Sequence, residues 1–131
     1  MRVYVTARFK GIENKADIEA LCAAVHQAGL EDVCFIRDVE HWQKAFPDPR
    51  ELWSRSLLEV KQCDALLIDV SDNPGGGRVL EAGIAYALGM PIFVLVKEGI
   101  PYKEIFTGIA TEVITYAAYD DIIPALSTYA S

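Results

Sequence analysis

The stretch GGGRVLEAGIAYALGMP, residues 75–91, contains residues whose types and spacing could do chemistry. Three glycines run directly into an expected helix, where they would let a ligand approach the backbone and the free helix amides would favour an anion. The stretch is not a P-loop, because no Gly-Lys-Ser/Thr follows, nor a GxGxxG motif, because Leu80 stands where the third glycine is needed. Two interpretations therefore remain open: a phosphate or sugar site, or an ordinary flexible turn.

Glu81 is the carboxylate of this stretch, and it falls in the first turns of the expected helix. Its neighbours at helical spacing form a mostly apolar stripe, which is an unusual setting for an acid. One interpretation is a glutamate that is stabilised by the positive end of the helix dipole. The other is a functional carboxylate that faces a ligand held by the glycines. The neighbours in question are Gly77, Ile84, Ala85 and Leu88.

The elements that must position these residues alternate between short apolar runs and helix-like segments. We expect strands at residues 3–6, 33–36, 65–70, 92–96 and 113–116. We expect helices between Asn14 and Gly29, over residues 50–62, from the glycines to Gly89, and over residues 120–129. This alternation predicts a single α/β domain, a three-layer (αβα) sandwich around a five-stranded, mostly parallel sheet of the flavodoxin or Rossmann type.

Ligands of such sheets bind outside the carboxyl ends of the strands. That rule brings together the loops at residues 7–11, from 38 onward and 71–77. The second loop carries His41 and Trp42, which suit base recognition by stacking or, equally, a surface lid without a ligand.

Composition excludes several classes of partner. The formal net charge of -7 argues against nucleic acid, which requires a basic surface. Cys22, Cys34 and Cys63 show no metal-binding spacing, so we expect reduced thiols and neither a metal nor a cofactor. The chain has no signal-like start and no apolar run long enough to cross a membrane, which indicates a cytoplasmic protein.

Residues 63–96, CDALLIDVSDNPGGGRVLEAGIAYALGMPIFVLV, resemble the core of the nucleoside 2-deoxyribosyltransferase superfamily. The most specific part of the resemblance is the combination of the glycine loop, Glu81, Gly83 and the small-residue helix. The superfamily contains transferases that exchange nucleobases and hydrolases that cut nucleoside 5′-monophosphates at the N-glycosidic bond. The resemblance implies that residues 1–131 form one such domain, that it acts on a small nucleoside or nucleotide, and that it forms a homo-oligomer, a dimer or higher.

The resemblance also implies roles for individual residues. Glu81 matches the nucleophile that attacks the anomeric carbon, a role that suits a carboxylate because the transition state resembles an oxocarbenium ion. The helix start is expected to keep Glu81 ionised. Tyr4 corresponds to a tyrosine near the nucleophile, and Asp69 to an acid at the end of the third strand, with capping of the loop at Ser71 as its structural alternative. The implied substrate contacts are Arg8, Lys10, Ser56, Ser71, Gly75, Gly76, Gly77 and Arg78.

One position departs from the family pattern. Members usually carry an aspartate on the preceding helix that faces the glutamate, and this chain has Ser56 there. Glu59, one turn later, is a candidate substitute. The departure leaves three interpretations: an altered substrate, an altered mechanism, or a nucleotide-binding relative without activity.

The sequence therefore predicts cleavage, by hydrolysis or base transfer, of the N-glycosidic bond of a nucleoside or nucleoside 5′-monophosphate through a glutamate nucleophile. The alternative from a different class is a non-catalytic nucleotide-binding module that has lost the second acid. A flavodoxin-like signalling domain is disfavoured, because the paired acids such a domain carries after its first strand are missing.

Overall fold

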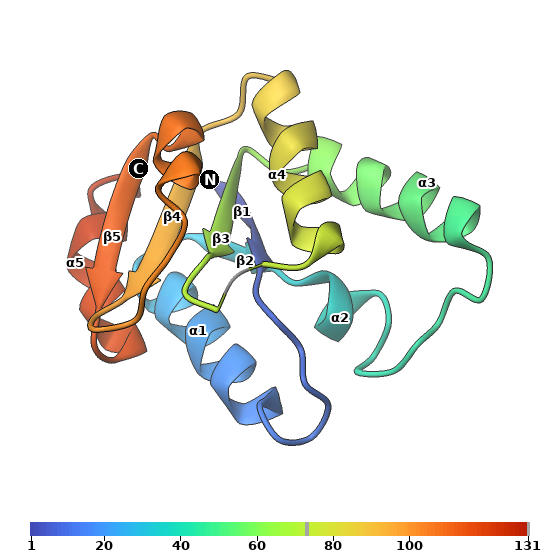
Figure 1. The fold of residues 1–131 in the computed structure, drawn as a ribbon, viewed down its shortest axis with the longest axis horizontal. Coiled ribbons are helices and arrows are strands. Elements are labelled where there is room, and N and C mark those ends of the chain that lie inside the picture. Colours follow the sequence, from blue (N-terminus) through green and yellow to red (C-terminus); the bar gives the residue numbers. More distant parts are fainter. Residues whose placement is uncertain (73, 131) are drawn as a thin grey trace.

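The computed structural model describes residues 1–72 and 74–130 (Figure 1). A five-stranded sheet in the order β2-β1-β3-β4-β5 runs through the centre, and all four strand pairings are parallel. This is the flavodoxin-like order, and it agrees with the predicted three-layer α/β sandwich. The strands are β1 (Arg2–Thr6), β2 (Glu31–Val33), β3 (Ala65–Asp69), β4 (Ile92–Lys97) and β5 (Glu112–Tyr116).

Helices cover both faces of the sheet. The α-helices are α1 (Lys15–Gln27), α2 (Phe35–Asp38), α3 (Pro49–Lys61), α4 (Gly76–Ala87) and α5 (Ile123–Ser127). Two 3₁₀ segments, η1 (Glu104–Ile109) and η2 (Tyr119–Ile122), complete the described elements. Helices α1 and α5 pack on one face, whereas α3 and α4 pack on the other (Figure 1).

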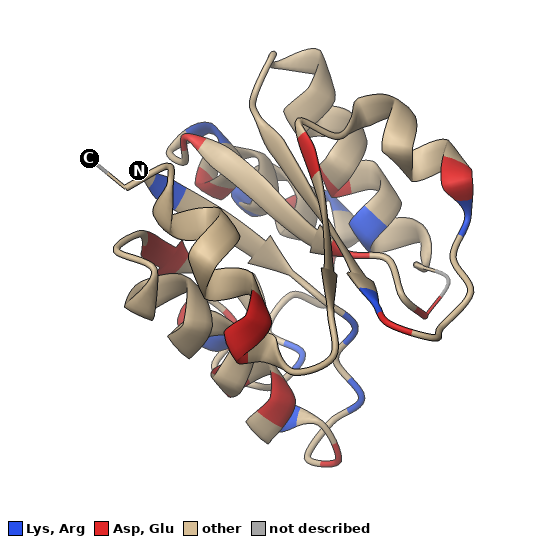
Figure 2. Ribbon diagram, turned by 90° about the vertical axis from the view of Figure 1, so that its left-hand side faces the viewer, with Lys and Arg blue, Asp and Glu red and all other residues tan. Residues whose placement is uncertain are grey.

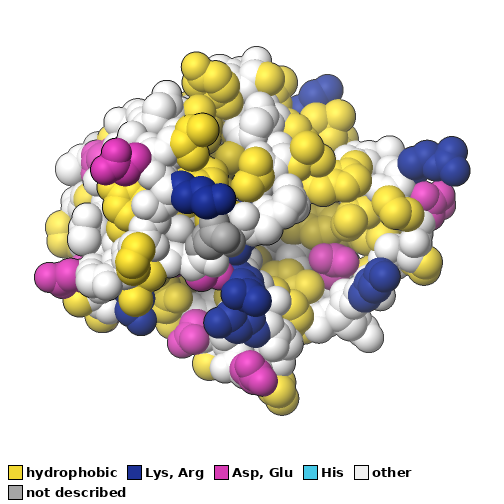
Figure 3. Space-filling model, in the orientation of Figure 1, with side chains coloured by type: hydrophobic (Ala, Val, Ile, Leu, Met, Phe, Trp, Pro, Cys, Tyr) yellow, Lys and Arg dark blue, Asp and Glu magenta, His cyan; other side chains and the backbone are white. Residues whose placement is uncertain are grey.

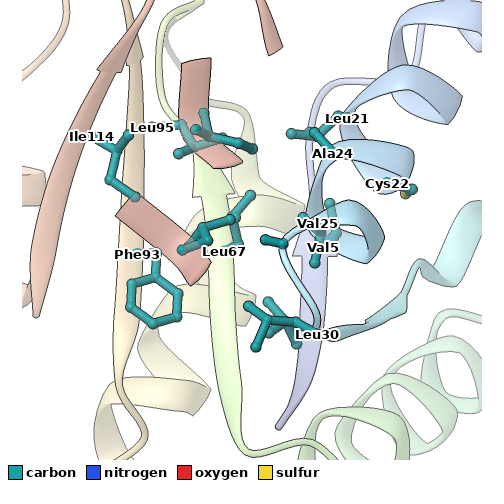
Figure 4. Close-up of a cluster of buried hydrophobic side chains, with 14 of the residues drawn as sticks. Val5, Leu21, Cys22, Ala24, Val25, Leu30, Leu67, Phe93, Leu95 and Ile114 are labelled. Carbon is teal, nitrogen blue, oxygen red and sulfur yellow. The ribbon is translucent and has the colours of Figure 1, made fainter. Parts of the chain in front are cut away.

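The alternation of side chains along the strands decides which residues belong to each face. In β1, Val3 and Val5 enter the cluster under α1, whereas Tyr4 lies with the cluster under α3 and α4. Figure 4 shows the first cluster, in which Val5 and Leu67 of the central strands lie near side chains of α1. The predicted apolar face of α1 is confirmed, since the side chains expected to point inward are buried: Ile18, Leu21, Cys22 and Val25.

The prediction of a strand at residues 33–36 is wrong. Strand β2 pairs with β1 only over Glu31–Val33, and the chain then turns into the short helix α2. The Cys34 amide donates to Asp38 Oδ2 at 2.9 Å, a local bond that favours this turn over further extension. The strand itself is short and partly polar because it lies at the edge of the sheet, where an apolar run is not required.

Two further differences concern the second half of the chain. The helix expected over residues 120–129 is divided into the 3₁₀ segment η2 and the short helix α5, which has a proline in its first turn. The sequence pattern also did not predict η1, which buries Phe106 in the cluster on the face that α3 and α4 cover. In the described residues, no helix is long and apolar enough to span a membrane.

Candidate active site

Glu81 projects from α4 toward β1 and is held there by two hydroxyl groups. The Tyr4 hydroxyl donates a hydrogen bond to Oε2 of Glu81. The Thr6 hydroxyl donates to Oε1 at 2.8 Å. Tyr4 and Thr6 are two residues apart on β1 and therefore point to the same face of the sheet, the face that α4 covers. Both carboxylate oxygens thus have a donor, which fixes the orientation of the acid.

The pKa of Glu81 is raised above its usual value by burial of the side chain. The hydrogen bonds from Tyr4 and Thr6 and the charge of Arg78 act in the opposite direction, and the charge of Glu40 adds to the increase. The net direction is upward, so the start of α4 does not by itself set the charge of Glu81. A carboxylate with a raised pKa is a stronger base and a better nucleophile once it is ionised.

Tyr4 acts as a hydrogen-bond donor in this arrangement. Its side chain is fully buried, and burial together with the charge of Glu81 raises the pKa of its hydroxyl. The phenol consequently stays protonated and keeps its bond to Glu81.

Glu81 lies on the wall of a cavity of about 590 Å³. The end of β1, the first loop, residues 34–36 at the start of α2, Glu40 in the loop after α2, and the start of α4 all contribute to the lining. Figure 3 shows this side of the molecule hollowed between the body and the projecting helix α3, with acidic and basic side chains around the hollow. The size is sufficient for a nucleoside-sized ligand. The polar and charged side chains of the lining are Tyr4, Thr6, Arg8, Glu40, Asp72, Arg78 and Glu81.

The three glycines of the loop line the same cavity. None of them has a positive φ, so the backbone conformation does not require glycine there. A Cβ atom added at Gly75, Gly76 or Gly77 meets nothing within 4 Å. The absence of side chains instead leaves open space beside Glu81, and the three glycines precede or begin α4, whose first amides point out of the helix. This arrangement suits the close approach of a sugar or an anion.

The three basic residues predicted to contact substrate lie in different settings. Arg8 lines the cavity and is half exposed, with Nη1 3.9 Å from Asp72 Oδ2. Arg78 is buried and binds the Asp69 carbonyl and the Asp72 carboxylate, both at 2.8 Å. Arg78 therefore holds Asp69 and Asp72, which precede the glycines, in place. Lys10 lines a smaller cavity that adjoins the first one and shares Arg8 and Arg78 with it.

Asp69 lies on the opposite face of the sheet from Glu81. It follows Leu67 in the alternation of β3, and Leu67 belongs to the cluster under α1. Its carboxylate accepts bonds from the Ser71 amide at 2.9 Å, from the Ser71 hydroxyl at 2.6 Å, and from the Tyr116 hydroxyl. Asp69 and Ser71 line the smaller cavity of about 310 Å³ with Lys10 and do not line the cavity of Glu81. The loop-capping role considered for Asp69 is the one that its contacts support.

Ser56, which stands where the family pattern places an aspartate, is almost completely buried in α3. Its hydroxyl forms no hydrogen bond with the described residues. Glu59, the candidate substitute, accepts a bond from Arg55 at 2.8 Å along the same helix. Neither side chain lines the cavity, so α3 does not supply a second acid to it.

The loop after α2 had two interpretations, base stacking or a surface lid without a ligand, and the contacts of its aromatic side chain are internal. Trp42 packs on Phe9, with ring centroids 5.6 Å apart, and Lys15 lies over its ring. His41 and Trp42 are the described non-glycine residues with positive φ, at 51° and 66°. Neither lines the cavity. Glu40, one residue earlier, does line the cavity. Its position could not be singled out from the sequence.

Thr6 was also missed, although the sequence contained a signal for it. A polar residue two positions after Tyr4 on a strand must lie on the same face as Tyr4, next to any group that the tyrosine contacts.

Within residues 1–72 and 74–130, no three histidine, cysteine, aspartate or glutamate side chains cluster as metal ligands would.

Solved structures with this fold include enzymes that act on nucleosides and nucleotides. The CMP N-glycosidase BcmB of Clostridium botulinum matches with a TM-score of 0.70 and 21% identity, over 98% of this chain and 100% of that one. The 2-deoxyribosyltransferase of Bacillus psychrosaccharolyticus matches with a TM-score of 0.74 and 16% identity, over 96% of both chains. A conserved protein of Enterococcus faecalis V583 matches with a TM-score of 0.81 and 14% identity, over 98% of both.

No protein-family model and no curated protein sequence matches the chain. At these identities the structural likeness establishes the fold. The chain has the fold of nucleoside 2-deoxyribosyltransferase-like proteins, and the resemblance read from residues 63–96 is confirmed at that level.

Proposed function

We propose that this protein cleaves the N-glycosidic bond of a nucleoside or nucleoside 5′-monophosphate, with Glu81 as the nucleophile. The observation that carries the proposal is the Glu81 carboxylate on the wall of a nucleoside-sized cavity, with Tyr4 and Thr6 bonded to its two oxygens. Such an acid is oriented for attack, and no basic side chain among the described residues forms an ion pair with it. The fold shared with an N-glycosidase and a deoxyribosyltransferase supports the same reaction class.

The proposed reaction begins with attack of a Glu81 oxygen on the anomeric carbon as the bond to the base nitrogen breaks. The transition state carries positive charge on the sugar, which the neighbouring carboxylate stabilises. Tyr4 and Thr6 hold the carboxylate in one rotamer, so little reorganisation is required before attack. Water or a second base then releases the sugar from Glu81, giving hydrolysis or transfer respectively.

A 5′-phosphate is the preferred feature of the substrate. The open glycines lie at the amino-terminal end of α4, a helix of twelve residues, and the unpaired amides of its first turn are available to an anion. Arg8 lines the cavity and is only loosely paired with Asp72, so its guanidinium can turn to a phosphate. Arg78 supports the loop indirectly through Asp72.

Ser56 supports the second candidate function, a nucleotide-binding module without catalysis. A serine cannot replace an aspartate as a proton donor or as an ionised partner of the sugar. If the lost acid was essential, the cavity would still bind nucleotide and the bond would stay intact.

Incubation with a panel of ribo- and deoxynucleosides and their 5′-monophosphates, followed by chromatography of the free base, distinguishes the two functions. The enzyme proposal predicts base release that falls by at least about 1,000-fold in Glu81→Gln, a loss in the range seen when a catalytic nucleophile is removed. Binding without release, measured by calorimetry on the same panel, would support the module. Absence of both would refute each of them.

A further inference from the structure

The proposed cleavage requires a proton for the departing base, and α3 carries Ser56 where the family pattern places an aspartate. A nucleobase leaves as a poor anion unless a positioned acid protonates it, which contributes about 100- to 10,000-fold to such reactions. Glu81 is committed to attack on the sugar, and Ser56 has a hydroxyl outside the cavity. The donor must therefore come from another element.

The cavity contains three carboxylates: Glu81, Asp72 and Glu40. Asp72 is paired with Arg78, which binds its two oxygens at 2.8 and 3.3 Å, and it lies on the loop that supports the glycines. Because both of its oxygens accept bonds from a buried guanidinium, the Asp72 carboxyl group is not free to turn toward a departing base. Asp72 also lies on the side proposed for the phosphate.

Glu40 lies in the loop after α2, on a different part of the cavity wall from the glycines. The only described hydrogen bond of its side chain is a long one, 3.5 Å from the Ala45 amide to Oε2, and no cation is paired with its carboxylate among the described residues. The apolar side chains of Phe35 and Ile36 line the cavity beside it, which is a suitable wall for a planar base. Its charge reaches Glu81, whose pKa it raises.

We propose that Glu40 is the proton donor to the leaving base, in place of the acid that is absent from α3. This inference rests on the proposed function. The carboxylic acid of Glu40 gives its proton to the base nitrogen as the C1′–N bond breaks and the bond from Glu81 to C1′ forms. In hydrolysis, the Glu40 carboxylate then takes a proton from water, the hydroxide oxygen bonds to C1′, and Glu81 is released as a carboxylate. The two steps leave both side chains as they began.

The test uses two substrates that differ only in their need for a proton. Purine nucleotides require protonation of the departing base, whereas N7-methylated purine nucleotides already carry a positive charge and depart as neutral bases. We expect Glu40→Gln to lower kcat by about 100-fold or more on the ordinary substrate. On the methylated substrate we expect a rate close to that of the unaltered protein. Glu19→Gln, an exposed position on α1, serves as the matched control.

Equal rates for Glu40→Gln and the unaltered protein on both substrates would overturn the inference and leave the proposed function standing. An equal loss on both substrates would also overturn it, since proton donation affects only one of them. Thermal unfolding of Glu40→Gln separates these outcomes from misfolding. Glu81→Gln must lose activity on both substrates, and failure of the unaltered protein to cleave any member of the nucleoside and nucleotide panel would refute the proposed function itself.

Discussion

At the residue scale, the site depends on how Glu81 is held. Its two oxygens have different donors, Tyr4 and Thr6, and both donors come from one strand. Burial raises the pKa of Glu81 while these bonds lower it. The charge state and the orientation of the nucleophile therefore depend on the same two hydroxyl groups.

Tyr4→Phe should reduce kcat/KM by about 10- to 100-fold, because a hydrogen bond to a charged group contributes about 1.5–3 kcal/mol. Loss of this bond raises the pKa of Glu81 further, so the acidic limb of the kcat/KM profile should move to higher pH. Tyr86→Phe, an exposed position on α4, is the matched control and should change neither quantity. An unshifted acidic limb in Tyr4→Phe would contradict the assigned contact.

Glu81 should also make the stability of the fold depend on pH. A carboxyl group whose pKa is raised in the folded state binds its proton more tightly there, so stability falls as pH rises above the unfolded value near 4.5. Glu81→Gln removes this loss, so its melting temperature should exceed that of the unaltered protein by a margin that grows as pH rises above 4.5 and levels off above the folded-state pKa. Below pH 4 the two should converge. A difference that stays constant with pH would show that burial of the carboxylate has no such cost.

At the scale of the elements, the glycine loop and α4 provide open space more than conformational freedom. Gly77→Ala should preserve the fold, since a Cβ there meets no atom within 4 Å. Gly77→Leu should also fold, but its side chain would enter the cavity and raise KM by about 10-fold or more, a difference of about 1.4 kcal/mol in binding. Steady-state kinetics of both variants check this. Equal KM values would mean that the ligand does not approach the loop.

The elements also show what could be read from the sequence. The apolar runs and the glycine-to-helix transition were sufficient to predict the parallel sheet, the helix α4 and the face of α1. The alternation along β3 contains the information that Asp69 and Glu81 lie on opposite faces, but it can be used only once the partner strands are known. The turn at Cys34 was not predicted, because a local bond to Asp38 competes with extension in an apolar run. Glu40 could not be found, because it lies in an irregular loop whose path depends on tertiary contacts.

At the scale of the whole molecule, the loops at the carboxyl ends of the strands carry both basic and acidic residues (Figure 2). The arrangement suits a small polar ligand and agrees with the expectation from the net charge of -7 that a polyanion is not the partner.

Helices α3 and α4 pack against each other and expose apolar side chains on their outer surface. The exposed side chains are Leu57, Leu58, Val79, Leu80, Tyr86 and Leu88.

This outer surface is where we expect a second copy of the chain to bind, since the family resemblance implies an oligomer. The double variant Leu58→Asp, Leu80→Asp should shift the mass measured by light scattering from an oligomer to a monomer of 14.5 kDa. Ile105→Asp, an equally exposed apolar position on η1, is the control and should leave the mass unchanged. A monomeric unaltered protein at high concentration would contradict this expectation.

The central claim is that Glu81 forms a covalent bond with the sugar, and intact-protein mass spectrometry tests it most directly. A 2′-fluorinated nucleotide slows release of the sugar, because the fluorine destabilises the oxocarbenium-like transition state. A covalent bond to Glu81 predicts a mass increase equal to the fluorinated sugar or its 5′-phosphate, carried by the peptide that contains Glu81. Glu81→Gln should show no such increase. Base release by the unaltered protein with the adduct on another residue, or with Glu81→Gln still active, would contradict the account.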